Sequence, residues 1–153
     1  MFRAVKYISR QAAESLRGDA NVVMVSINEP GGEPARLMGG FAAVLRIAFW
    51  DVNTPHPVTR EYKDESFVYT PITTQQAQEI AEFPDRWHAP PDGPELLIVH
   101  CRAGVSRSAA VARFAAERYG IELAQNAELA NAEVLRKLRQ AVGMVLTAGE
   151  EKR

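Results

Sequence analysis

The sequence predicts an α/β fold, a three-layer sandwich in which a central, mostly parallel sheet is flanked by helices. Short apolar runs rich in β-branched residues recur along the chain, as in residues 21–27 and 96–100, and such runs are typical of strands buried on both faces. Segments with apolar residues at helical spacing separate or follow these runs. Alternating strands and helices indicate a parallel sheet, because each parallel connection has to cross back along the sheet.

The first third of the chain is expected to supply three strands and one short helix. Ser9 is a residue type that caps helices, and Gly18 is one that ends them. In chain order we expect a strand over Ala4–Ser9, a brief helix between Ser9 and Gly18, a strand over Asn21–Ile27, a loop over Glu29–Gly40 and a strand over Val44–Val52.

In the middle of the chain, residues 54–63 carry two prolines and scattered charges. We expect mostly loop here, with a short edge strand over Ser66–Tyr69. Thr73 or Thr74 is expected to cap the next helix, which Pro84 ends or kinks.

The last third predicts one strand and two helices. The run Leu96–His100 is the clearest strand of the sequence, and a helix over Ser106–Tyr119 should follow it, with Gly120 just past its end. An amphipathic helix is expected over Asn131–Leu146, and a frayed tail over Glu150–Arg153.

Composition limits the classes of function. The chain has 153 residues, 46% of them hydrophobic, which suits a single domain over residues 1–153. Its net charge of −1 argues against general binding of nucleic acid or an anionic membrane. No apolar stretch is long enough to span a bilayer, no secretory signal is recognisable, and one cysteine excludes both an internal disulfide and a multi-cysteine metal cluster. We expect a cytoplasmic protein without metal or other cofactor.

The specific signal lies in residues 96–108, LLIVHCRAGVSRS. A buried strand leads into a short loop and the loop into a helix, so backbone N–H groups should converge at the positive end of the helix dipole. Five residues separate Cys101 from Arg107, and Gly104 gives the loop the freedom to curl. The guanidinium of Arg107 suits two oxygens of a tetrahedral dianion, so the pattern predicts a phosphate site.

The same surroundings favour a reactive sulfur. Thiols at helix N-termini beside cations have pKa values of roughly 3.5–7.5, against about 8.5 for a free cysteine. We therefore expect Cys101 to attack phosphorus as a thiolate and to form a cysteinyl-phosphate. Ser108 is placed to hydrogen-bond the departing sulfur, and His100 to orient the loop. The alternative is that Cys101 is a small buried hydrophobe and Arg107 a surface cation.

The segment HCRAGVSRS resembles the signature of cysteine-dependent protein tyrosine phosphatases, and the chain length is similar to that of the compact dual-specificity group. The resemblance covers about thirteen residues and implies a metal-independent phosphomonoesterase with a phosphatase-like fold. By motif match, Cys101 is the nucleophile, Arg107 binds the phosphate and Ser108 assists the leaving sulfur. The substrate-binding residues are then His100, Arg102, Ala103, Gly104, Val105 and Ser106.

The general acid of this family is an aspartate on a mobile loop, usually some thirty residues before the cysteine. Here Asp51 follows a predicted core strand but lies 50 residues upstream, and Asp64 lies 37 residues upstream in a charged segment. An insertion from Asn53 to Thr70, relative to the family, would account for the long spacing, so Asp51 is the preferred candidate. The insertion is then a candidate substrate lid or a tolerated surface excursion. Asp64 and the absence of a dedicated acid stay open.

Three functions follow from this pattern. The first is hydrolysis of phosphotyrosine, with phosphoserine and phosphothreonine added if the pocket is shallow; the partner is then a phosphorylated protein or a small phosphomonoester. The second is a phosphatase-like module that binds phosphoproteins with little or no turnover, which the uncertain acid favours. The third is sulfur transfer of the rhodanese-like kind, which the residues flanking Cys101 and Arg107 disfavour.

Overall fold

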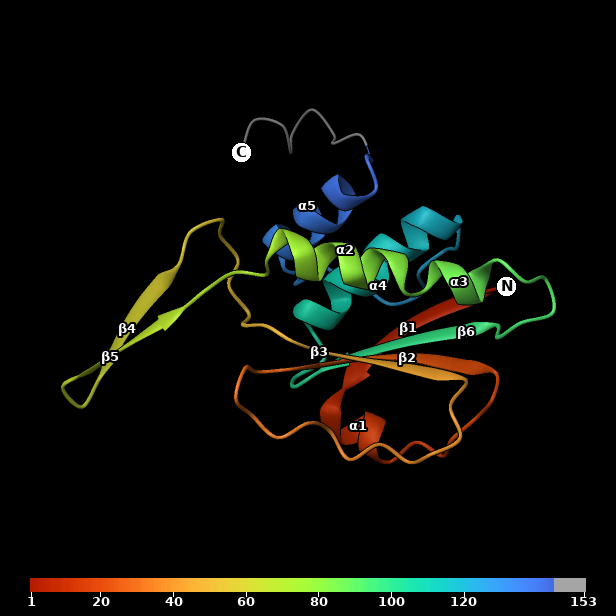
Figure 1. Cartoon of the computed structure of the whole chain (residues 1–153), viewed down its shortest axis with the longest axis horizontal. Coiled ribbons are helices and arrows are strands. Elements are labelled where there is room, and N and C mark those ends of the chain that lie inside the picture. Colours follow the sequence, from red (N-terminus) through yellow and green to blue (C-terminus); the bar gives the residue numbers. More distant parts are fainter. Residues whose placement is uncertain (145–153) are drawn as a thin grey trace.

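The central sheet contains four strands, all parallel, in the order β1–β6–β2–β3 (Figure 1). The structure is a computed structural model and describes residues 1–144. The strands of this sheet are β1 (Ala4–Ser9), β2 (Val22–Asn28), β3 (Ala43–Ala48) and β6 (Leu96–Cys101). The predicted α/β class with a mostly parallel sheet is confirmed. Because the strands are parallel, their carboxyl ends meet at one edge, and Cys101 lies there, paired with Ser9.

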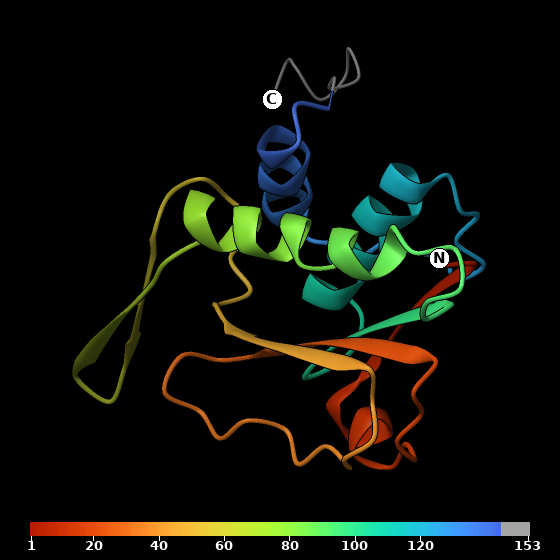
Figure 2. The same cartoon turned by 45° about the vertical axis from the view of Figure 1, so that its right-hand side comes forward.

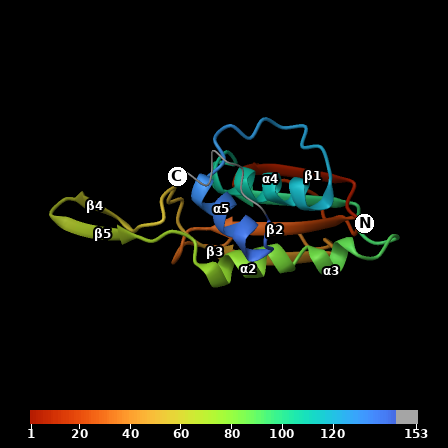
Figure 3. The same cartoon turned by 90° about the horizontal axis from the view of Figure 1, so that it is seen from above.

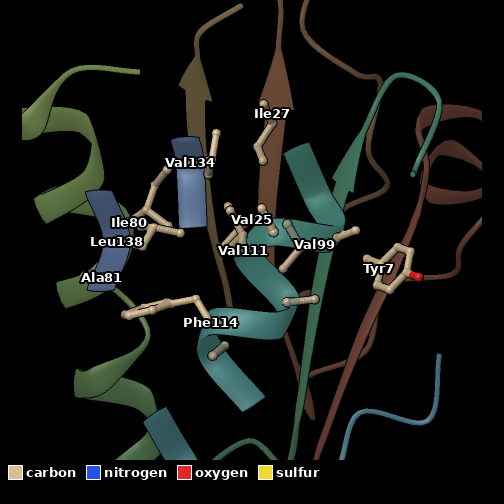
Figure 4. Packing of buried hydrophobic residues seen from close by; sticks show 14 of the residues in the cluster. Tyr7, Val25, Ile27, Ile80, Ala81, Val99, Val111, Phe114, Val134 and Leu138 are labelled. Carbon is tan, nitrogen blue, oxygen red and sulfur yellow. The ribbon is translucent and has the colours of Figure 1, made fainter. Parts of the chain in front are cut away.

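Most of the helical structure covers one face of the sheet. Figures 1 and 2 show α2 (Thr74–Glu82), α3 (Asp85–His88), α4 (Arg107–Tyr119) and α5 (Ala132–Ala141) on that side. Figure 4 shows the packing between these layers, where Val25 and Val99 of the sheet lie beside Val111 of α4. The central strands are buried on both faces because they carry almost unbroken apolar sequence.

The opposite face of the sheet has a thinner cover. It consists of the five-residue helix α1 (Arg10–Glu14) and the irregular segment 29–42. Leu16, Leu37 and Phe41 pack there against a small cluster that includes Met24. The two outer layers of the predicted sandwich are therefore very unequal.

The helix ends follow the capping chemistry of the sequence. Ser9 Oγ accepts a hydrogen bond from the Ala12 N–H at 3.1 Å. Thr73 and Gln76 form a reciprocal capping box at the start of α2, with two hydrogen bonds of 3.0 Å. Gly120 ends α4 with a φ of 66°.

α5 is shorter than expected. Val142 is its C-cap residue, and Gly143 follows in the left-handed region, with a φ of 68°. Leu146 and the expected frayed tail, 150–153, lie outside the described residues.

The insertion forms neither a loop nor an edge strand of the main sheet. It is an antiparallel hairpin of β4 (Val58–Tyr62) and β5 (Glu65–Tyr69), and it projects away from the rest of the molecule in Figures 1 and 3. Lys63 and Asp64 make its turn, both with positive φ, as a tight two-residue hairpin turn requires. The strand expected at Ser66–Tyr69 is confirmed as part of β5, but it pairs with β4 in a separate sheet and not with the edge of the main sheet. No helix in the described part of the chain is long and apolar enough to cross a membrane.

Candidate functional site

The loop between β6 and α4 lies at the carboxyl edge of the sheet. Cys101 is the last residue of β6 and Arg107 the first of α4. The first turn of α4 has no side-chain cap; the hydroxyl of its N-cap residue, Ser106, donates to Asp51. The uncapped N–H groups leave the positive end of the helix available to an anion.

Gly104 presses the loop against the end of β1. Its φ is +73°, and a Cβ atom added there would lie 2.4 Å from the Ser9 nitrogen and 2.5 Å from the Ile8 carbonyl carbon. A side chain is therefore excluded both by the backbone angle and by space. Next to it, the Arg10 N–H donates to the Arg102 carbonyl at 3.2 Å. The predicted conformational role of Gly104 thus has a second cause, which is the close approach of another strand.

The sulfur of Cys101 lies inside the curl of this loop. The residue is 2% exposed, and its Sγ accepts a hydrogen bond from the Gly104 N–H at 3.3 Å. Ser108 Oγ lies 3.1 Å from the same sulfur. The structure therefore brings Cys101, Gly104 and Ser108 together, and the hydroxyl is within reach of any charge that develops on the sulfur.

Arg107 is buried, with 5% of its surface exposed, and two of its three nitrogens are held by the protein. Nη1 donates to the Phe49 carbonyl at 2.8 Å and Nη2 to Glu29 Oε1 at 2.7 Å. Nε is also buried and has no hydrogen-bond partner within residues 1–144. A buried guanidinium N–H without an acceptor is unfavourable, so the arrangement fits an anion that supplies one.

Glu29 is ionised beside Arg107. Burial alone would raise the pKa of the Glu29 carboxyl, but hydrogen bonds from Arg107 and from a backbone N–H, with the charges of Arg107 and Arg102, hold it below its ordinary value. The ion pair fixes the guanidinium plane before any ligand binds.

His100 lies beneath the loop and is fully buried. Its Nε2 is 2.6 Å from Ser26 Oγ, and its Nδ1 lies 3.4 Å from the Cys101 carbonyl oxygen. Burial lowers the pKa of the His100 ring, although the hydrogen bond to the Cys101 carbonyl opposes this shift. A neutral, enclosed imidazole can position the loop, but it does not reach a substrate in its mouth.

Asp51 adjoins the loop. Its Oδ1 accepts hydrogen bonds from Ser106 Oγ at 2.8 Å and from Asn131 Nδ2 at 2.7 Å. Asp64 instead occupies the turn at the tip of the hairpin, which extends away from the sheet (Figure 1). Of the two acids considered from the sequence, the structure brings only Asp51 to the loop. The other loop residues, Arg102, Ala103 and Val105, are exposed around its mouth.

A hollow of about 520 Å³ lies next to Arg107 and Asp51. We call it the entrance hollow; its lining residues are Glu29, Trp50, Asp51, Val52, Asn53, Thr54, Val58, Arg60, Tyr69 and Arg107. Trp50 and Tyr69 meet edge to face there, with ring centroids 4.8 Å apart. Within residues 1–144 no three His, Cys, Asp or Glu side chains are grouped so that they could hold a metal ion.

Sequence reasoning missed Glu29, the Phe49 carbonyl, Ser26 and the aromatic pair of the hollow. Glu29 follows directly after β2, a strand recognised from its apolar run. The rule that ligands bind at the carboxyl ends of parallel strands could have placed it near Cys101. Nothing in the sequence signalled that the far end of the insertion, at Tyr69, returns to the hollow.

Comparison with protein-family models, with curated proteins and with solved structures finds no match for this chain.

Proposed function

We propose that this protein is a phosphatase of the protein tyrosine phosphatase type, which hydrolyses phosphomonoesters through a cysteinyl-phosphate without a metal ion. The observation that carries the proposal is the buried Nε of Arg107, a donor without a partner among the described residues, in a loop that curls around a cysteine sulfur. A tetrahedral dianion above Cys101 supplies the missing acceptor and also accepts from the open N–H groups of α4.

The first step transfers the phosphoryl group to sulfur. The Cys101 thiolate attacks phosphorus, the P–S bond forms, and the bond from phosphorus to the ester oxygen breaks. Asp51 gives its proton to the departing oxygen, and Arg107 with the loop N–H groups stabilises the charge of the transferring group. Glu29 keeps the guanidinium in place, through the ion pair of 2.7 Å.

The second step returns the enzyme to its first state. Water attacks phosphorus, Asp51 takes up a proton from it, and the P–S bond breaks. Ser108, with its hydroxyl 3.1 Å from the sulfur, donates a hydrogen bond to the thiolate as it leaves. Inorganic phosphate and an unmodified Cys101 are the products.

The test is hydrolysis of a small aryl phosphate, without metal, by the wild type and by Cys101→Ser. We expect turnover by the wild type and a loss of at least about 10⁴-fold in the variant, because the serine hydroxyl has no adjacent base. Turnover that survives in Cys101→Ser would overturn the nucleophile. If the wild type binds phosphopeptide tightly but releases no phosphate, the protein is a phosphatase-like module that binds phosphoproteins. Thiosulfate-dependent consumption of cyanide would indicate sulfur transfer.

A further inference from the structure

The hairpin has one face that continues the wall of the entrance hollow. Residues directly opposite each other in an antiparallel pair share a face, and successive residues alternate between faces. Val58 pairs with Tyr69 and Arg60 with Phe67, so these four side chains lie on one face. Three of them, Val58, Arg60 and Tyr69, line the hollow. We call this face the inner face of the arm, the arm being residues 58–69.

The two faces of the arm differ in composition. The inner face carries Val58, Arg60, Tyr62, Glu65, Phe67 and Tyr69, whereas the outer face carries Thr59, Glu61, Ser66 and Val68. All the aromatic residues of the arm are therefore on the side of the hollow. Tyr62 is 65% exposed and Phe67 is 41% exposed, so these rings are not buried against the body of the protein.

The arm extends well beyond the space that a phosphate ester needs. Each strand has five residues, which corresponds to roughly 17 Å. Figures 1 and 3 show it running outward from the sheet, while the contact of Trp50 with Tyr69 holds its base. A small phosphomonoester would fit within the hollow and leave the outer part of the arm bare. A polymeric substrate would extend from the hollow onto the outer part of the arm.

The acidic residue of the inner face, Glu65, pairs with Tyr62 beside the turn, away from the hollow. Arg60 gives the part of this face that borders the hollow a charge preference. It lines the hollow and is exposed, and no carboxylate within residues 1–144 forms an ion pair with it. Arg107, by contrast, is neutralised by Glu29. An exposed and unpaired cation beside the phosphate site favours an acidic group next to the phosphorylated residue.

From these observations we propose that the substrate is an extended polypeptide that lies along the inner face of the arm. This inference rests on the proposed phosphatase function and adds its substrate class. The phosphorylated residue enters the hollow, and an acidic and an apolar side chain next to it meet Arg60 and Phe67, which lie opposite each other on the inner face. The continuity of the hollow with the inner face, and the charge of Arg60, carry the argument.

The experiment compares kcat/KM for three substrates: a small aryl phosphate, a phosphotyrosine peptide with acidic and leucine flanks, and the same peptide with neutral, small flanks. Phe67→Ala is expected to lower the ratio of acidic peptide to aryl phosphate about tenfold, the effect of removing an aromatic contact. Arg60→Gln should remove most of the preference for the acidic peptide over the neutral one.

Two outer-face variants are the matched controls. Val68→Ala truncates an exposed apolar residue, and Thr59→Glu makes the same change in net charge as Arg60→Gln. Both should keep the wild-type ratios. If the wild type hydrolyses the aryl phosphate but Phe67→Ala and Arg60→Gln behave like their controls, or if no peptide is preferred, the arm proposal is overturned and the phosphatase stands. If the wild type hydrolyses none of the three, both proposals fail.

Discussion

The loop from Cys101 to Arg107 and the arm from residue 58 to residue 69 border the same hollow but are held in opposite ways. The loop is fastened to four other parts of the chain: β1 beneath Gly104, Phe49 and Glu29 at Arg107, and Asn131, whose N–H donates to the Ser106 carbonyl at 3.1 Å. The arm is held mainly by its own ladder and by the Tyr69 contact at its base.

Under the proposed function, this difference separates the residues that carry out the chemistry from those that recognise the substrate. Donors that stabilise a transition state are effective when they are already in place, because no reorganisation is needed at the moment of reaction. Peptides of varied sequence bind more readily to a surface that can change its conformation. A two-stranded hairpin suits this role because it is only marginally stable alone. On this account, changes in the loop affect rate and stability strongly, whereas changes in the arm affect substrate preference.

After the loss expected in Cys101→Ser, the largest effect concerns the acid. Asp51→Asn should lower kcat by about 10²–10⁴-fold with phenyl phosphate, because the amide cannot protonate the departing oxygen. The loss should be smaller with nitrophenyl phosphate, whose leaving group needs the proton less. Asp64→Asn, at the tip of the arm, is the matched control and should keep wild-type activity. Equal loss with both esters would contradict the assignment of Asp51 as acid.

The next largest loss of activity is expected for Arg107→Lys. Lysine keeps the charge but not the planar pair of donors, so we expect kcat/KM for an aryl phosphate to fall by about 10²–10³-fold. Steady-state kinetics measures the loss, and competition by inorganic phosphate shows whether the anion site is affected in parallel. A lysine variant with near wild-type kcat/KM would remove the guanidinium contact with the phosphate from the account.

For stability, the sharpest comparison is between two glycines with similar backbone angles. Gly104→Ala combines positive φ with a clash against β1, and should lower the free energy of unfolding by about 3 kcal/mol or more. Gly120→Ala has positive φ but nothing within 4 Å, so about 1 kcal/mol is expected. Urea unfolding of both variants measures the difference. Equal losses would mean that the loop does not press on β1.

Glu29→Gln should lower the free energy of unfolding at pH 7 by about 1 kcal/mol, because a charge-assisted hydrogen bond to Arg107 is weakened. The pKa of Glu29 is lowered in the folded protein from its ordinary 4.5, so its stabilising effect is present above pH 4.5 and is lost as the pH falls through the folded value. Denaturant unfolding of both proteins at several pH values should show the gap constant near neutrality and closing in acid. A gap that widens in acid would contradict the ion pair.

The smallest effect is expected in the arm. Phe67→Ala should change the free energy of unfolding by less than about 0.5 kcal/mol, because its ring is 41% exposed and outside the main core. Phe114→Ala, which truncates a buried residue of α4, is the comparison, and we expect it to lower the free energy of unfolding by about 3–5 kcal/mol. Thermal unfolding of the two variants measures the difference. A large loss in Phe67→Ala would show that the arm is part of the core.

The elements that the sequence predicted well are those whose signals are local. The strand at Leu96–Cys101 is a buried apolar run, and the capping residues Ser9 and Thr73 lie where the helices begin. Gly104, Cys101 and Ser108 belong to one short segment, so their proximity follows from spacing alone. Local signals thus predicted the loop and most elements around it.

The rest depends on long-range contacts. Glu29 meets Arg107 across 78 residues, and Asn131 meets Asp51 across 80, so no local pattern pairs them. The hairpin was missed because its turn, Lys63–Asp64, lacks the glycine or asparagine that usually marks positive φ. The unequal layers of the sandwich likewise depend on how loop 29–42 packs.

The most direct test of the central claim is to trap the intermediate. The wild type is mixed with an aryl phosphate, quenched in acid within the first turnover, digested and analysed by mass spectrometry. The account predicts a phosphoryl group on Cys101 in the wild type, more of it in Ser108→Ala, whose sulfur leaves more slowly, and none in Cys101→Ser. Turnover without any phosphoryl group on Cys101, or phosphate bound covalently elsewhere, would contradict it.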